Sequence, residues 1–175
     1  DGDRVTLSGT SSSILGGQVG DVFVLAADDA GSLAFVALHR NRLDVEDLPS
    51  HDVVRRNAQV TADDLTLDAG DVLAVDAQRV LDLAATLFAA EASGLADWAT
   101  TTAADYARVR QQFGRVIGQF QGVKHKVARM LALTEQARVT AWDAIRAHGA
   151  DVPADETSLA AAVAAAVAPD AAFQV

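Results

Sequence analysis

Residues 106–130, YARVRQQFGRVIGQFQGVKHKVARM, carry the strongest structural signal in the chain. This segment contains no Asp or Glu, although the whole chain has a formal net charge of −10. Its basic residues are Arg108, Arg110, Arg115, Lys124, Lys126 and Arg129. Helical runs are expected on either side of a short, glycine-broken stretch between Phe113 and Gly118. A basic segment of this kind inside an acidic protein is typical of a site for a phosphate-bearing ligand.

The composition indicates a globular protein. The chain has 175 residues, half of them apolar, which is enough for one large hydrophobic core or two small ones. Cysteine is absent, which excludes disulfides and thiolate metal sites and is compatible with a reducing compartment. No apolar run is long enough for a membrane span, and the N-terminus lacks a signal-peptide pattern. We therefore expect a cytoplasmic location, and the acidic balance argues against nucleic acid as the main partner.

The distribution of charge divides the chain into two parts. Residues 1–76 contain five Arg and fourteen Asp or Glu, whereas residues 77–175 contain nine Lys or Arg and ten Asp or Glu. This shift predicts two modules, residues 1–75 and 76–175, with a boundary near Asp76.

Short strands bounded by turns are expected in the first part. The hydrophobic pattern predicts strands at residues 4–9, 21–27, 33–39, 43–48, 53–60, 65–67 and 72–73. The second and third of these are separated by a turn and should form a hairpin. Strands of this length and spacing predict a small antiparallel β-barrel or sandwich.

Helical periodicity begins after Asp76. The first helix is predicted to run to Val109 with Gly94 inside it, and the second to cover residues 121–148. A third, rich in alanine and valine, is predicted at residues 159–167 with Thr157 as its N-cap. Small side chains pack closely, so these helices predict an antiparallel bundle. Strands followed by helices place the chain in the α+β class.

The central segment resembles the acyl-CoA dehydrogenase family. The chain matches the pattern R-x-Q-F-G-x-x-I-x-x-F-Q at seven positions: Arg110, Gln112, Phe113, Gly114, Ile117, Phe120 and Gln121. The sequence V-K-H-K-x-A-x-M follows at residues 123–130. The opening DGDRVTLSGT is similar to the family's D-G-x-x-x-L-x-G-T hairpin. The resemblance implies a partial middle β-domain over residues 1–75, followed by a truncated C-terminal helical bundle domain over residues 76–175. It also implies that this is a fragment or a truncated form, without the N-terminal helical domain or the segment beyond the third helix.

Four residues are predicted to bind a cofactor: Arg110, Gln112, Phe113 and Gln121. The Arg110 guanidinium suits a pyrophosphate and the Gln121 amide suits polar ring or ribose atoms, although Arg110 could instead pair with a carboxylate at the bundle edge. Phe113 is predicted to cover an adenine face or to pack in the core, and Gln112 could lie on an ordinary exposed turn. The resemblance implies that the cofactor is FAD bound mainly by a neighbouring subunit.

Other polar residues give weaker signals. His125, with Lys124 and Lys126, could meet the phosphates of CoA or form a solvated helix face. His39, His51, His125 and His148 show no ligand spacing, so no metal site is predicted. Neither a nucleophile elbow nor a phosphate-binding loop occurs.

No catalytic residue is predicted. The resemblance implies a carboxylate that removes the α-proton of an acyl thioester, in some members 26 residues before the motif arginine; here that position is Ala84, which cannot act as a base. Ala85 stands where many members have arginine, although Asp82 matches. Glu91 could be a displaced base or a structural glutamate. Ser11–Ser12–Ser13–Ile14 also lacks the tryptophan that touches the flavin in many members.

Two functional interpretations remain open. The first is an FAD-dependent acyl-CoA dehydrogenase that acts on an acyl-CoA in fatty acid or sterol side-chain oxidation and passes electrons to an acceptor. The alternative is a non-catalytic partner subunit that lends its R-x-Q-F-G segment to the FAD of another chain. Both imply a homo- or hetero-oligomer assembled through the helical domain. A module without any ligand is a third possibility, against which the motif spacing weighs.

Overall fold

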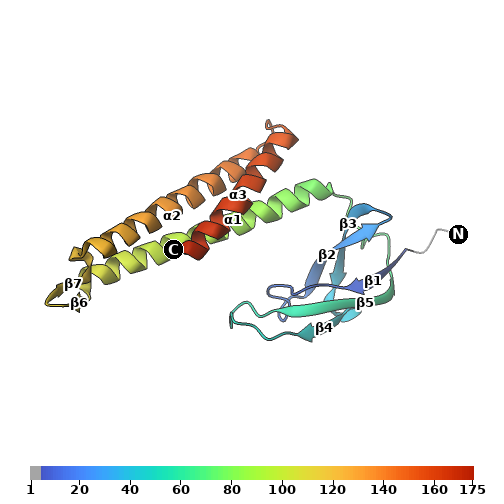
Figure 1. Cartoon of the computed structure of the whole chain (residues 1–175). Coiled ribbons are helices and arrows are strands. Elements are labelled where there is room, and N and C mark those ends of the chain that lie inside the picture. Colours follow the sequence, from blue (N-terminus) through green and yellow to red (C-terminus); the bar gives the residue numbers. More distant parts are fainter. Residues whose placement is uncertain (1–4) are drawn as a thin grey trace. The chain divides into compact units, whose positions relative to one another are not determined.

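The computed structural model describes residues 5–175 and divides into two compact units. One unit extends to Ala77 and the other runs from Gln78 to Val175. Strands make up the first unit and helices dominate the second (Figure 1). The predicted α+β order is therefore confirmed.

The first unit contains two antiparallel sheets. Strand β5 (Ala58–Thr66) lies between β1 (Thr6–Thr10) and β4 (Asp44–Asp47) in a three-stranded sheet. Strands β2 (Val22–Asp29) and β3 (Ser32–His39) form the predicted hairpin, and η1 (Arg40–Arg42) follows. Buried apolar side chains come from β2, β3 and β5: Phe23, Phe35, Val36, Leu38, Ala58, Val60 and Ala62. Within the part of the chain that the structure describes, the strands do not close into a barrel.

The strand predicted at residues 53–60 is wrong over residues 53–57. The Asp52 carboxylate accepts hydrogen bonds from the amides of Val54 and Arg55, at 2.8 and 3.1 Å, and so forms a turn. Val53 and Val54 consequently remain 74% and 81% exposed. The strand begins only at Ala58 and runs on to Thr66, so it includes the first two residues of the separate strand predicted at 65–67. Residues 72–73 contribute only a bridge between Val36 and Val72, and Arg4 of the predicted first strand lies outside the described residues.

An ion pair closes the loop after β5. Both oxygens of the Asp71 carboxylate lie 2.8 Å from Nη1 of Arg42, whose Nη2 donates to the Thr66 carbonyl oxygen at 2.8 Å. The Asp68 backbone amide also donates to Asp71, at 2.7 Å. This amide and, after it, the Arg42 guanidinium lower the pKa of Asp71 below its ordinary value.

Asp71→Asn is expected to destabilise the first unit at neutral pH. Because the folded state lowers the Asp71 pKa, the carboxylate's stabilising effect is complete above the unfolded-state value of 3.8 and is lost as the pH falls through the folded-state value. Urea unfolding should therefore show a smaller difference in the free energy of unfolding between Asp71→Asn and the native protein at pH 3 than at pH 7. Asp68→Asn is the control, since Asp68 acts through its backbone amide. A pH-independent difference would contradict this role.

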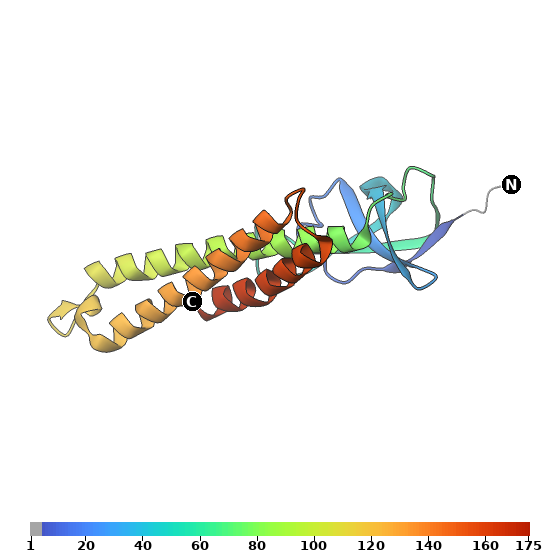
Figure 2. The same cartoon turned by 90° about the horizontal axis from the view of Figure 1, so that it is seen from above.

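Three helices form the second unit. They are α1 (Ala77–Val109), α2 (Gln121–Ala147) and α3 (Ala154–Gln174), with α3 folded back along α2 (Figures 1 and 2). Their buried core is made of alanine: Ala89, Ala137, Ala141, Ala144, Ala164, Ala168 and Ala171. Buried positions alternate by three and four along α2 and α3, as in helices that cross at a small angle. We call this set of residues the alanine seam.

The third helix is longer than predicted. It starts at Ala154 and continues to Gln174, past Pro169, which removes one backbone donor without ending the helix. Thr157 is not its N-cap. It lies inside the first turn, and its hydroxyl donates to the Ala147 carbonyl oxygen at 2.6 Å, tying α3 to the end of α2. Among the described residues, no helix is long and apolar enough to cross a membrane.

Two glycines of the second unit should respond to alanine in opposite ways. A Cβ at Gly94, inside α1, would meet no atom within 4 Å, whereas one at Gly118 would lie 2.8 Å from the Ala107 carbonyl oxygen. Gly94→Ala is therefore expected to stabilise the chain by about 1 kcal/mol. Gly118→Ala should destabilise it by about 1–3 kcal/mol, the usual range for overpacking. Chemical unfolding measures both changes in the free energy of unfolding. Equal effects would contradict the conclusion that a Cβ fits at Gly94 and not at Gly118.

Candidate functional site

A small β-hairpin joins α1 to α2 at one end of the bundle (Figure 1). Its strands are β6 (Gln111–Gln112) and β7 (Arg115–Val116), and η2 (Ile117–Gln119) leads into α2. The Ile117 amide donates to the Arg110 carbonyl oxygen at 2.8 Å and closes the hairpin at its base. The predicted break in the helices is thus an ordered structure that fixes both Arg110 and the start of α2.

The turn of this hairpin has an unusual backbone. Phe113 and Gly114 have φ values of 53° and 76°, a left-handed pair that matches a two-residue hairpin turn. Glycine adopts such values freely, whereas a bulky aromatic residue does so only under strain. The Phe113 side chain is 90% exposed, so burial does not stabilise this conformation.

Several positively charged side chains around the hairpin are not paired with a carboxylate in the described part of the chain. Within residues 5–175, the side chains of Arg110, Lys124 and Lys126 make no ion pair, and all three are exposed. No side chain caps the N-terminus of α2, and its first turn carries no acidic residue. The positive end of the helix dipole therefore adds to the field of the basic side chains. This combination favours an anionic ligand.

The four predicted cofactor-binding residues lie in or beside the hairpin. Arg110 is exposed just before β6, and Gln112 donates to the Gln111 carbonyl oxygen at 2.8 Å. Phe113 is at the tip and does not pack in a core. Gln121 begins α2 and bonds through Nε2 to Nε2 of His125 at 3.0 Å, which leaves its amide oxygen free of partners in the described part of the chain. Their role as cofactor ligands stays a prediction.

Sequence reasoning missed a contact at the centre of this site. The Arg115 guanidinium carbon lies 4.3 Å from the centroid of the Phe120 ring. Phe120 also meets Phe113 edge-on, with ring centroids 6.1 Å apart and planes at 87°. Arg115 and Phe120 both belong to residues 106–130, but the sequence does not show that Arg115 lies over the Phe120 ring.

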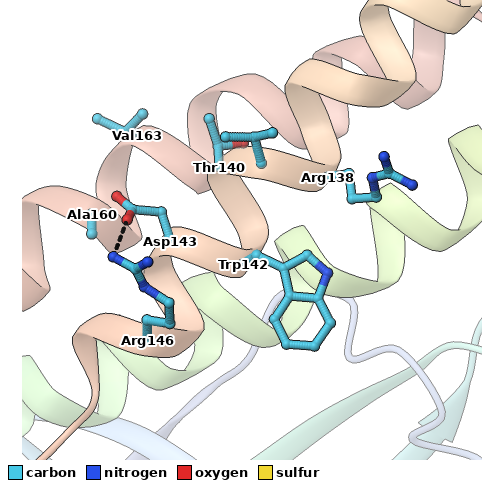
Figure 3. Close-up of a pocket in the computed structure, with 8 residues that line it drawn as sticks. Arg138, Thr140, Trp142, Asp143, Arg146, Ala160 and Val163 are labelled. Atoms are coloured by element: carbon cyan, nitrogen blue, oxygen red, sulfur yellow. Dashed lines mark hydrogen bonds and ion pairs between the residues drawn. The ribbon is translucent and has the colours of Figure 1, made fainter.

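Several grooves lie on the helical unit. One, of about 320 Å³, adjoins the hairpin and is lined by small and apolar residues and by Arg108 and Lys124. A second, of about 330 Å³, lies over α2 and α3, and its lining includes Trp142 and the ion pair of Arg146 with Asp143 at 3.4 Å (Figure 3). None of the predicted site residues lines the second groove.

A buried polar cluster lies at the other end of the bundle. Asp82 of α1, 7% exposed, accepts hydrogen bonds from Gln78 at 2.8 Å and from the Ser158 hydroxyl of α3 at 2.6 Å. Thr86 donates its hydroxyl proton to the Asp82 carbonyl oxygen, so it accepts from Nε2 of His148 at 3.0 Å. Nδ1 of His148 is buried and has no hydrogen-bond partner in the described part of the chain.

The two positions considered for a catalytic base both lie on α1. Ala84 is half-buried and carries no titratable group, whereas Glu91 is exposed on the same helix. Across residues 5–175, no group of three or more His, Cys, Asp or Glu is placed to hold a metal ion.

Comparison with known proteins identifies the family. A sequence profile of the acyl-CoA dehydrogenase C-terminal domain matches residues 74–175. Acyl-CoA dehydrogenase FadE34 of Mycobacterium tuberculosis is 47% identical over 167 residues, which are 95% of this chain and 23% of that protein. Acyl-CoA dehydrogenase IpdE2 of the same organism is 31% identical over 137 residues, 77% of this chain and 38% of that protein.

Solved structures agree. A variant of the Tcur3481-Tcur3483 steroid ACAD superposes with a TM-score of 0.87 at 27% identity, over 99% of this chain and 47% of that one. Butyryl-CoA dehydrogenase from Megasphaera elsdenii shares the fold, with a TM-score of 0.81 at 24% identity over 95% of this chain and 46% of that one. The chain therefore belongs to the acyl-CoA dehydrogenase family. It spans about half the length of these solved relatives and 23–38% of these curated ones.

Proposed function

We propose that this chain contributes the interface half of an FAD site, and that the whole protein dehydrogenates an acyl-CoA thioester at its α and β carbons. One observation carries the proposal: the hairpin region brings together Arg110, which makes no ion pair within residues 5–175, an exposed aromatic ring and a helix N-terminus without a side-chain cap in that range. FAD has a pyrophosphate and two aromatic ring systems, and membership of the family makes it the expected cofactor.

The residues at the hairpin fit such a cofactor chemically. Arg110 offers a planar cation with several donors, suited to phosphate oxygens. Phe113 offers an exposed ring face or edge to an aromatic group, at the tip of the hairpin. Gln121 has a free amide oxygen beside the start of α2, where backbone amides favour anions. The segment contains no acidic residue that would repel a diphosphate.

The chain's own part in the reaction would be to bind and orient. When bound, FAD supplies the acceptor for the hydride that leaves the β carbon. Arg110 and Gln121 would hold it from this side of the subunit interface, while the proton of the α carbon needs a carboxylate from elsewhere. Ala84 cannot provide that carboxylate, so a self-sufficient enzyme requires a base from another part of the protein.

The alternative function is that of a non-catalytic partner subunit. Ala84 favours it, because the position implied for the base in some family members carries no titratable group. The similar steroid ACAD carries two protein names, Tcur3481 and Tcur3483. A mixed assembly would let this chain keep its cofactor-binding hairpin while another chain supplies the base.

Purification of the whole protein, with and without co-produced homologues, tests both functions. Flavin absorbance in a single-polypeptide oligomer, bleached by an acyl-CoA, is the result expected for the enzyme. A colourless protein that acquires flavin and activity only with a second chain would support the partner-subunit function. No flavin in any assembly would overturn both functions. If the chain proves inactive alone, Ala84→Glu should not restore turnover, because the Ser11–Ser13 segment also departs from the family pattern; measurable turnover would show that only the base is missing.

A further inference from the structure

The hairpin tip is held by a stack of three side chains. Arg115, from β7, places its guanidinium 4.3 Å above the Phe120 ring at the start of α2. Phe120 in turn contacts Phe113, at the tip, edge-on at 6.1 Å. The stack thus links both the turn and the second strand of the hairpin to the end of α2, which carries Gln121.

The backbone of the turn explains why such a stack is needed. Phe113 has a φ of 53°, which is unfavourable for a bulky residue, and its side chain is 90% exposed. Neither intrinsic preference nor burial therefore keeps Phe113 in place. The edge-on contact with Phe120 is the aromatic contact that holds it among the described residues.

Arg115 differs from the other cations of the site. Its charge lies over the negative face of an aromatic ring, and it forms no ion pair within residues 5–175. Arg110, by contrast, has no partner for its guanidinium in the same part of the chain. One arginine is committed to the hairpin, whereas the other remains available for a ligand.

We propose that Arg115 and Phe120 are positioning residues of the flavin site, which hold Phe113 and the start of α2 in place without binding the ligand. This inference rests on the proposed function of the hairpin. It predicts that the charge of Arg115 acts on Phe120 and not on the pyrophosphate.

A double-mutant cycle on the whole protein tests the proposal. FAD affinity is measured by flavin fluorescence for Arg115→Gln, Phe120→Leu and both together. Each single variant should raise the Kd about two- to fivefold, the scale of one cation–π contact, and the double variant should add nothing beyond the larger single effect. Arg115→Lys should restore affinity to within about twofold, because an ammonium also lies favourably over a ring.

The salt dependence separates positioning from direct binding. The FAD affinity of Arg115→Gln should fall with salt as steeply as that of the native protein, whereas Arg110→Gln should flatten this dependence because it removes a cation that faces phosphate. Equal flattening in both variants, or independent effects of Arg115→Gln and Phe120→Leu, would overturn the proposal.

A measurement without FAD distinguishes failure of this proposal from failure of the proposed function. Trypsin cleavage after Arg110, which the stack variants retain, should accelerate about two- to fivefold in Arg115→Gln and Phe120→Leu, because loss of the contact lets the hairpin open more often. Unchanged cleavage would show that the stack does not order the hairpin. If cleavage accelerates in the variants as expected but the native protein does not bind FAD, the stack does order the hairpin and the flavin function is overturned instead.

Discussion

Arg110→Ala is expected to weaken FAD binding by about 1.5–3 kcal/mol, the contribution of hydrogen bonds to a charged group. The guanidinium is exposed beside β6 and makes no ion pair in the described chain, so its loss removes a ligand contact without breaking an internal one. Retention of flavin during gel filtration, and the Kd measured by fluorescence, report the change.

Arg108→Ala is the matched control for Arg110. Arg108 lies two residues earlier and carries the same charge, but its Nη1 is 2.6 Å from the Asp105 carboxylate. Its removal should therefore change FAD affinity far less, because only the general loss of one positive charge remains. Equal losses in the two variants, or unchanged flavin occupancy in Arg110→Ala, would remove the basis for assigning Arg110 to the cofactor.

Asp82→Ala is expected to lower the free energy of unfolding of the helical unit by about 1.5–3 kcal/mol. The carboxylate is buried and receives two side-chain hydrogen bonds, one of them from Ser158 on α3. Truncation breaks the hydrogen bonds from the Ser158 hydroxyl and from Gln78 and loosens the link between α1 and α3. Urea denaturation followed by circular dichroism measures the loss.

Asp97→Ala provides the comparison for Asp82, because it removes an exposed carboxylate from the same helix. Its effect should stay within about 0.5 kcal/mol, as for most surface substitutions. Ser158→Ala should fall between the two, since Asp82 then keeps its bond with Gln78. If Asp82→Ala were as mild as Asp97→Ala, the buried cluster would not connect the helices.

The helices and the first hairpin could be predicted because their signals are local. The apolar period along α1 predicted its end at Val109, and the turn between β2 and β3 separates two strongly apolar runs. The strand predicted at residues 53–60 was wrong because the Asp52 side chain competes for two backbone amides, a contact that hydrophobic patterning does not register. The third helix was predicted too short because it continues through Pro169, supported by its packing on α2.

The same distinction applies to the candidate site. Arg110, Gln112, Phe113 and Gln121 belong to one contiguous motif, so sequence alone could group them. The contact of Arg115 with Phe120 depends on the local backbone path from β7 through η2, which hydrophobic periodicity does not specify. The bond between Asp82 and Ser158 joins residues 76 positions apart, and such contacts leave no periodic trace in one sequence.

Because of the alanine seam, α2 is expected to move as one rigid body when its packing changes. An alanine side chain loses no rotamer freedom on burial, and it cannot move aside when a neighbour grows. A larger residue at Ala141 or Ala164 must therefore displace a whole helix, not a side chain. Since α2 is a single helix of 27 residues, about 40 Å long, a shift at the seam is transmitted to Gln121 at its other end. Substitutions in the alanine seam can thus change the position of Gln121, although they make no contact with the hairpin.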